Sequence, residues 1–474
     1  MSASVTLKSK KRDFTEGPIF KSMLLYTIPI ILTALLQLCY NMADNIVVGQ
    51  WSGEEFALAA VGATGPLNNL IVNLLMGIGA GGAIVVAHAF GAKDYDKLSR
   101  AVHTSVTFSF IGGIIFGLIF FLVSKPALTL MGIDSAFIDL SVKYMQILAF
   151  GIPASSVYNY SAAILRSVGD SRSPLIILSS SGLINVGLNL IFVICFNMDV
   201  DGVAIATIIS QYISATAAVT LLVKRKNMPY AFSFKKMAID KKILIESMRL
   251  GIPSGIQASM FSISNMIIVS SMNSFGPYVY TGYTINSNID SILYCICSGF
   301  STTCLTFTAQ NYGAKNIKRI RKALLYSIVQ AVSVGFICGQ IILLFTDPLA
   351  MLFMPENQTN IDIILKTTRE LTKMLLSTYF LLGVLSVISG ALRGIGYSIL
   401  QMILYIIGLC GTRVFWVYVI FPLWNSPVGL MVCYPASWIV SIIFLGTARV
   451  IAEKKLKIKL AVTNLSEEEN KHST

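Results

Sequence analysis

The sequence predicts an all-α polytopic membrane protein with 12 transmembrane helices, on the strength of three observations. Of the 474 residues, 55% are apolar and only 12% are charged, about half the charged fraction of a soluble globular protein. Apolar runs of about 20 residues, the length that crosses a bilayer as a helix, recur along the whole chain. The Lys and Arg residues gather in alternate segments between these runs. We therefore expect no separate soluble domain.

The predicted spans follow one another at short intervals. The N-terminal stretch "MSASVTLKSKKRDF" is basic but lacks the short apolar segment and cleavage site of a secretory signal, so the first span is expected to stay in the protein. All eight cysteines fall inside apolar runs, and we interpret them as small core residues. The predicted spans are residues 22–48, 57–87, 101–123, 144–165, 174–196, 202–223, 248–272, 284–310, 323–345, 374–392, 399–421 and 429–450.

The basic residues predict the topology. Most of the 36 Lys and Arg residues lie before the first span, after the last span, or in every second connecting segment. Arg166 and Arg393 belong to two of these connecting segments. By the positive-inside rule both termini are then cytoplasmic, as expected of a multi-pass protein of the plasma (inner) membrane. The net charge of +13 is thus a topology signal. No base-reading motif accompanies it, and we expect no nucleic-acid partner.

The two halves of the chain have similar sequences. A basic linker at 224–242 separates them, and six spans per half make the repeat parallel, with predicted bundles at residues 1–230 and 231–474. Two like bundles related by an axis along the membrane normal are one of the architectures of transporters, although a duplication can also be purely structural. The matched positions are Pro29 with Pro253, Asn41 with Asn265, "AFGAK" with "NYGAK", "LRSVG" with "LRGIG", and Gly202 with Gly429.

A carboxylate interrupts the first apolar run. Gln37, Asn41 and Asp44 are spaced by four and three residues, which places them on one helical face with Thr33. An ionised side chain at the centre of a bilayer costs at least about 2.5 kcal/mol and normally faces a bundle interior or a wet cavity. The alternative is that Asp44 has already reached the outer headgroup region and is merely solvated. At the sister position of the second half stands Ile268, so we expect ion chemistry in the N-terminal bundle.

Further polar residues lie within other spans of the first half. They are Tyr158 and Asn159 in the fourth span, Ser181, Asn185 and Asn189 in the fifth, and Thr207 and Gln211 in the sixth. One carboxylate with several amide and hydroxyl oxygens suits Na⁺ or a bound proton. For any single Asn or Thr, helix-to-helix hydrogen bonding is an equally ordinary role.

The second half offers two charged candidates for a substrate cavity. Asp290, near the start of the eighth span, either lines the cavity or is solvated at the interface. Arg413 lies inside the eleventh span, where facing lipid would be costly; it snorkels, pairs with a carboxylate or binds an anionic group. With Gln37, Asn41 and Tyr158 from the first half, these two residues are the predicted substrate-cavity set.

Motifs of enzymes and of ATP-driven pumps are absent from the sequence. There is no Gly-x4-Gly-Lys-Ser/Thr phosphate loop and no paired-His metalloprotease motif. We expect a protein that is not an enzyme, needs no cofactor, and uses an ion gradient or the gradient of its substrate. The glycine-rich "GIGAGGAIVV" at 77–86 lies within the second span, where small residues predict close helix packing.

Four motifs carry a resemblance to a known family: "YNMADNIVVGQ" in the first span, "FGAKD" after the second, "AAILRSVGDSRSPL" after the fourth and "QNYGAK" after the eighth. With these motifs and its six-plus-six repeat, the chain resembles the multidrug and toxic compound extrusion (MATE) family over residues 17–450. The resemblance implies two bundles forming a V-shaped cavity. It also implies export of organic cations and drugs in exchange for H⁺ or Na⁺.

Within that family the chain looks like the bacterial DNA-damage-inducible branch, whose ion site lies in the N-terminal bundle. Carried over position by position, the implied ion-coupling residues are Asp44, Asn159, Asn185, Asn189 and Thr207, and a bound Na⁺ would contact Asp44, Asn185, Asn189 and Thr207. The chain departs from the branch at "INVGLN", where Asn189 replaces a second acid. The site then holds a single formal negative charge.

Two other functions compete with drug export. A lipid-linked oligosaccharide flippase of the same superfamily is one, although such proteins tend to have a basic central cavity. A membrane-embedded transferase is the other, and it calls for paired carboxylates near a membrane face. The expected partners are organic cations or drugs and membrane lipid, and the expected state is a monomer.

Overall fold

The computed structural model describes residues 13–52, 56–354 and 360–472, and the regular structure of this part of the chain is helical. In the first half the elements are α1 (Ile19–Trp51), α2 (Ala57–Gly91), α3 (Tyr95–Leu130), α4 (Ile138–Ala149), α5 (Ile152–Ser167), α6 (Arg172–Leu190), the π-helical η1 (Ile191–Cys195) and α7 (Asp199–Lys224).

The second half begins with the short η2 (Phe234–Lys236). The longer helices that follow are α8 (Lys241–Asn273), α9 (Pro277–Gly313), α10 (Ile317–Leu344), α12 (Ile361–Ser377), α13 (Tyr379–Gly394), α14 (Ser398–Tyr405) and α17 (Cys433–His472). Short elements between them are α11 (Thr346–Met351), η3 (Ile406–Gly411), α15 (Thr412–Phe415), η4 (Trp416–Ile420), η5 (Phe421–Leu423) and α16 (Pro427–Met431).

Ten helices of the described chain are long and apolar enough to cross a membrane, or 11 when α12 and α13, bent by 47° at Thr378, are taken as one span. The remaining predicted span, 144–165, is not the single helix that we expected, because α4 ends at Ala149 and α5 begins at Ile152. Pro153 at the start of α5 has no backbone N–H to continue the preceding helix. Together α4 and α5 occupy the place of that span.

The two halves repeat the same turns. After α2 and after α9, the equivalent Lys93 and Lys315 adopt a positive φ of 57° and 55°. The following α3 and α10 are then capped alike, because Asp94 accepts from the Lys97 N–H and Asn316 accepts from the Arg319 N–H. After α5 and α13, Gly169 and Gly396 both have a φ of 88°, which favours glycine. The structure thus reproduces the repeat of the sequence in local geometry.

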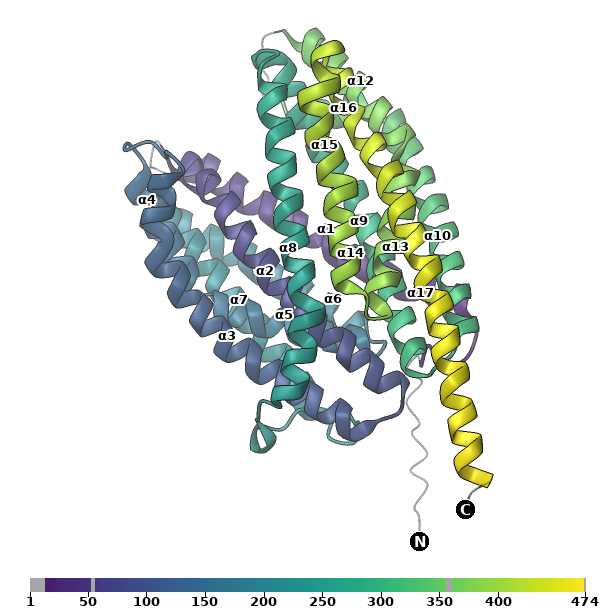
Figure 1. Ribbon diagram of the computed structural model, residues 1–474. Helices are drawn as coiled ribbons and strands as arrows, with labels where there is room; N and C mark the ends of the chain where they lie inside the picture. Colours follow the sequence, from purple (N-terminus) through teal and green to yellow (C-terminus); the bar gives the residue numbers. More distant parts are fainter. Residues whose placement is uncertain (1–12, 53–55, 355–359, 473–474) are drawn as a thin grey trace.

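The halves diverge toward one end of the molecule and meet at the other, where α1 begins and α17 ends (Figure 1). We call these the open end and the terminal end. The main contact between halves joins α2 to α8, which belongs to the second half in sequence. A Cβ at Gly77 or Gly81 would collide with the α8 backbone at Gly255 and Ser247. The predicted close packing of the "GIGAGGAIVV" stretch is confirmed.

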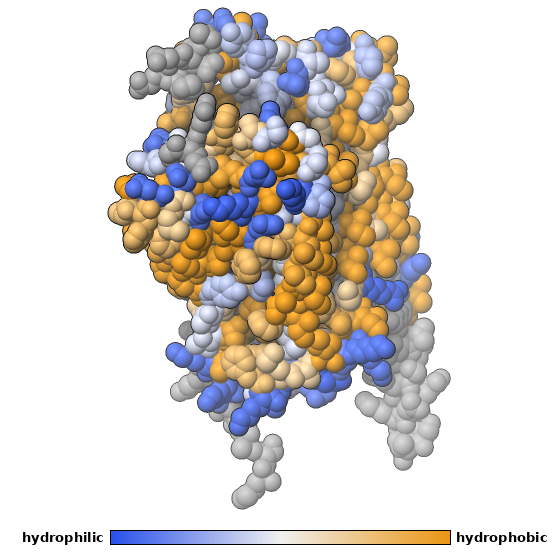
Figure 2. All heavy atoms as spheres, turned by 90° about the vertical axis from the view of Figure 1, so that its left-hand side faces the viewer, coloured by the Kyte–Doolittle hydropathy of each residue, from blue (hydrophilic) through white to orange (hydrophobic). Residues whose placement is uncertain are grey.

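Apolar side chains cover the outside of the bundles. On α3, Ile115, Leu118 and Leu122 are 53–64% exposed. Hydrophobic residues cover large parts of the surface in Figure 2, and hydrophilic residues gather at its upper and lower ends and in a patch across the middle. Polar side chains such as Asn185, Asn189 and Gln310 are buried instead. This distribution fits a lipid environment, because lipid contacts the exposed apolar side chains. The chain is a multi-pass membrane protein.

Candidate functional site

A polar cavity of about 120 Å³ lies inside the first half. Helices α1, α5, α6 and α7 contribute its walls, so residues from distant parts of the sequence meet there. Its lining includes most of the predicted ion-coupling and cavity residues of this half, namely Gln37, Asn41, Asp44, Tyr158, Asn159, Asn185 and Thr207, together with Tyr40, Ser155, Ser181, Ser210, Gln211 and Ser214. Among the described residues of this lining, Asp44 is the one that carries a formal charge.

Asn189 holds the Asp44 carboxylate from behind the cavity wall. Its Nδ2 donates to Asp44 Oδ1 at 2.5 Å, and its side chain is 0% exposed. The Oδ1 atom of Asn189 has no hydrogen-bond partner among the described residues. Asn189 therefore stabilises the charged carboxylate as a donor, which an aspartate at this position could do only when protonated.

The other amides line the cavity beside Asp44. Asn185 Nδ2 lies 3.5 Å from Thr207 Oγ1, and Asn159 Nδ2 donates to the Ser155 carbonyl at 2.9 Å. Both residues line the cavity, and each side chain also has an amide oxygen that can accept a hydrogen bond or a cation. One carboxylate, amide oxygens and a hydroxyl form an oxygen donor set that suits a hard monovalent cation or a proton.

The equivalent place in the second half carries no charge. Ile268 is 0% exposed in α8 and belongs to the apolar core of that half. The two bundles therefore share a fold but differ in chemistry at this position.

A larger cavity of about 580 Å³ lies in the second half, bordered by α8, α9, α13, α14 and α17 and by Asn73 of α2. Asp290 lines it, and its Oδ1 has no partner among the described residues. Hydroxyl groups and aromatic rings form much of the remaining wall, among them Phe261, Tyr283, Tyr294, Ser298, Ser301, Tyr405 and Tyr434.

Arg413 lies behind this wall and not on it. The side chain is 1% exposed, and its guanidinium donates to Asn265 Oδ1 at 2.6 Å and to Ser437 Oγ at 3.3 Å. The same group stacks over Tyr434 at 4.3 Å and Phe261 at 5.1 Å from the ring centroids. One amide, one hydroxyl group and two aromatic rings therefore contact the Arg413 guanidinium, and it forms no ion pair with a carboxylate of the described chain.

Arg393 is the functional candidate that sequence reasoning missed. Because Arg393 directly follows the tenth predicted span, we expected it to be a basic residue of a loop. The structure places it on the lining of the larger cavity. It follows Leu392 in the last turn of α13. The sequence signal for it is the repeat of "LRSVG" as "LRGIG", which places an arginine at the same position of both halves.

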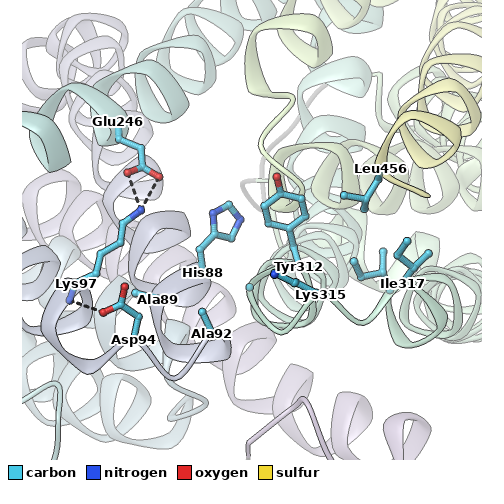
Figure 3. Close-up of a pocket in the computed structure, with 12 residues that line it drawn as sticks. His88, Ala89, Ala92, Asp94, Lys97, Glu246, Tyr312, Lys315, Ile317 and Leu456 are labelled. Carbon is cyan, nitrogen blue, oxygen red and sulfur yellow. Dashed lines mark hydrogen bonds and ion pairs between the residues drawn. The ribbon is translucent and has the colours of Figure 1, made fainter. Parts of the chain in front are cut away.

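The terminal end is closed by contacts between the halves. His88 Nε2 of α2 lies 2.8 Å from the carbonyl oxygen of Gly394, directly after Arg393, and its ring packs against Tyr312 at 4.7 Å between centroids. His88 and Tyr312 also border a pocket of about 360 Å³ that the Lys97–Glu246 ion pair lines (Figure 3).

The segment before α1 adds a second set of these contacts. Phe14 is 1% exposed and stacks on Phe307 of α9 at 3.8 Å. The backbone N–H of Phe14 donates to Gln310 Oε1 at 3.1 Å, and its carbonyl accepts from Asn311 and Arg319. A part of the chain that belongs to the first half is therefore anchored on the second half.

Two helical bundles that enclose polar cavities and meet at one end are typical of polytopic membrane transport proteins. The chain belongs to the MatE family of multidrug and toxic compound extrusion transporters, whose sequence profile matches residues 29–191 and 253–419. The probable multidrug resistance protein YoeA of Bacillus subtilis (strain 168) is 27% identical over 450 residues, which cover 93% of this chain and 96% of that protein.

Solved structures share the fold. An outward-facing conformation of a multidrug resistance MATE family transporter of the MOP superfamily superposes with a TM-score of 0.85 at 22% identity, covering 94% of this chain and 99% of the other. The crystal structure of MATE in the straight conformation gives a TM-score of 0.83 at 22% identity, covering 95% and 99%. The prediction of two six-helix bundles in the MATE arrangement is confirmed.

Proposed function

We propose that the protein is a secondary active multidrug exporter that expels organic cations and drugs in exchange for H⁺ or Na⁺. The observation that carries this proposal is a single carboxylate, Asp44, held by Asn189 on the wall of a polar cavity in the first half. The family and the likeness to a probable multidrug resistance protein support the drug-export part. MATE transporters are not enzymes, and we propose no catalysis for this chain.

Asp44 is proposed to link ion and substrate. When the carboxylate is charged, it favours a cationic substrate within the cavities. When H⁺ or Na⁺ occupies it, the charge is removed or compensated. The hydrogen bond between Asp44 of α1 and Asn189 of α6 then weakens, which changes how these two helices pack. A shift of this kind offers a route by which ion binding favours substrate release.

The membrane orientation is part of the same proposal. With most basic residues at the terminal end, both termini face the cytoplasm of a cell whose plasma membrane holds the protein. The closed terminal end and the divergent open end then correspond to a state open to the outside. We further propose that the protein works as a monomer surrounded by lipid, since each half supplies its own cavity.

Dye transport in proteoliposomes tests this proposal. Vesicles with the purified protein are loaded with a cationic rhodamine ester and given a transmembrane gradient of either pH or Na⁺, at zero membrane potential. We expect one of the two gradients to drive the dye against its concentration. Dye movement that is the same with either gradient and with none would contradict ion-coupled export, and a dye that does not move at all would contradict transport of organic cations.

A further inference from the structure

We propose that the larger cavity in the second half recognises the anionic group of an amphoteric organic substrate through Arg393. Such a substrate carries a cationic and an acidic group on one molecule. This inference deepens the proposed export function and rests on it, because it concerns which molecules the cavities accept.

Arg393 presents a charge that the protein leaves uncompensated. It lines the cavity, and its guanidinium makes one hydrogen bond within the described chain, from Nη2 to Ser301 Oγ at 3.4 Å. Its Nε has no partner among the described residues, and in that part of the chain no carboxylate lies within ion-pair distance of it. The Arg393 side chain is half-buried and its Nε is fully buried. A guanidinium partly removed from water without a carboxylate is costly, and an anion bound in the cavity would offset that cost through charge-assisted hydrogen bonds.

The neighbours of Arg393 on the cavity wall support binding of a ligand. Ser301 Oγ donates to the Ser386 carbonyl at 2.7 Å and accepts from Arg393, so this hydroxyl links the guanidinium to the α13 backbone. On the facing helix α8, Ser254 Oγ and Gln257 Oε1 line the same cavity and are buried without a hydrogen-bond partner among the described residues. Buried polar groups are normally paired, and a substrate that brings polar atoms of its own would pair them.

An acid stands at a distance along the same cavity. Asp290, Tyr294, Ser298 and Ser301 follow one face of α9, at intervals of four, four and three residues, and all four line the cavity. Eleven residues of helix separate Asp290 from Ser301, the contact of Arg393, which is about 16 Å along the axis. The cavity is therefore bipolar, with an unpaired carboxylate oxygen toward the open end and a guanidinium toward the terminal end.

A second arginine behind the cavity wall also supports binding of an anionic group. Arg413 donates to Asn265, which lines the cavity, and is itself paired with no carboxylate in the described chain. Among the described residues, the second half thus places one guanidinium group and one carboxylate on the cavity wall and a second guanidinium group behind it, whereas the smaller cavity of the first half has Asp44 as its one charged residue. A substrate with a cationic group and an acidic group matches this arrangement better than a simple cation does.

A pair of dyes that differ by one carboxylate tests the proposal. Tetramethylrhodamine with its free carboxylate is a zwitterion, and its methyl ester is a cation with the same chromophore. Dissociation constants for both are measured by fluorescence anisotropy on the purified full-length protein, without any ion gradient. We expect the wild type to bind the zwitterion more tightly, and R393Q to weaken zwitterion binding about tenfold relative to the ester, the effect of one lost charge-assisted hydrogen bond.

Two further variants separate recognition from structure. R393K keeps the charge and should retain most of the preference for the zwitterion. R166Q removes the arginine at the equivalent place of the first half, which does not line this cavity, and should leave the ratio of the two dissociation constants unchanged. Equal loss of both dyes in R393Q would show a structural arginine and overturn the proposal.

The wild type alone also decides the matter if R393Q does not fold. A wild-type protein that binds both dyes equally, or prefers the ester, overturns recognition of an anionic group. That outcome leaves the proposed function intact provided that the ester dye is still driven across proteoliposomes by an ion gradient. Failure of ester transport, by contrast, would count against the export function itself.

Discussion

Replacing Asp44 by Asn is expected to uncouple transport from the ion gradient while leaving the fold in place. The amide of D44N has nearly the size of the carboxylate, and its oxygen still accepts the hydrogen bond that Asn189 donates at 2.5 Å in the wild type. What is lost is the one formal charge among the described residues that line the first cavity. The packing of α1 against α6 is retained, so the change isolates the chemistry of the carboxylate.

The size of the effect follows from the number of acids. In the proposed mechanism a single carboxylate exchanges one H⁺ or Na⁺ per cationic substrate, and a tenfold ion gradient stores about 1.4 kcal/mol of free energy per mole of ion. With the membrane potential clamped at zero, the wild type can therefore build a dye gradient of at most about tenfold. D44N is expected to build none.

The assay uses proteoliposomes, a cationic rhodamine ester and a tenfold gradient of H⁺ or of Na⁺. D139N is the matched control, because Asp139 is an exposed aspartate of the same half in α4, and it should behave as the wild type. A D44N protein that still concentrates dye would refute the role given to this carboxylate. In N189D a second acid joins the first, and the limiting dye gradient should rise toward about 100-fold; an unchanged limit would refute the link between acids and stoichiometry.

Three other predictions concern stability and conformation. G77A should destabilise the protein by about 1–3 kcal/mol, because its Cβ would meet the α8 backbone, while G62A on the same helix meets nothing within 4 Å; equal melting temperatures would contradict this. F14A removes a buried ring from the terminal-end contact, so spin-label distances across that end should lengthen, and unchanged distances would contradict its anchoring role. Burial raises the pKa of Asp170, but hydrogen bonds from Ser173 and Arg225 and the charge of Arg225 lower it overall. Its ion pair with Arg225 thus stabilises the fold at neutral pH, and this contribution is lost as the pH falls below about 4. R225Q should melt earlier at pH 7 and lose this acid-dependent part, and an unchanged pH profile would count against the pair.

The local features of the chain could be predicted because bilayer-spanning helices satisfy their own backbone hydrogen bonds. An apolar run of the right length becomes a helix whatever its neighbours are, so the number of spans and the repeat followed from the sequence. The polar face of the first span also followed, since the spacing of Gln37, Asn41 and Asp44 is a property of one helix. The break between α4 and α5 was not foreseen as a division of that span, although Pro153 was its visible cause.

Contacts between segments that are distant in the sequence could not be predicted from apolar runs and helix periodicity. The sequence showed Asn189 in place of an acid, but only the structure placed it behind Asp44 as a hydrogen-bond donor. Likewise, the sequence suggested that Arg393 is a basic residue of a cytoplasmic loop, because it directly follows a predicted span. The position of an arginine next to a span does not show whether its long side chain extends to solvent or into a cavity. The roles of these residues in transport stay predictions that the experiments above test.

The sequence by itself determined that this chain crosses a membrane many times, that its halves repeat, and that one of them carries an acid the other lacks. Only the tertiary structure decided that α8 packs on α2 through Gly77 and Gly81, that one cavity surrounds Asp44, and that a second cavity contains both Asp290 and Arg393. The physical reason is the distance along the chain over which each effect acts. Hydrophobicity and helix periodicity act within about 20 residues, whereas a cavity is formed by side chains that meet from helices far apart along the chain.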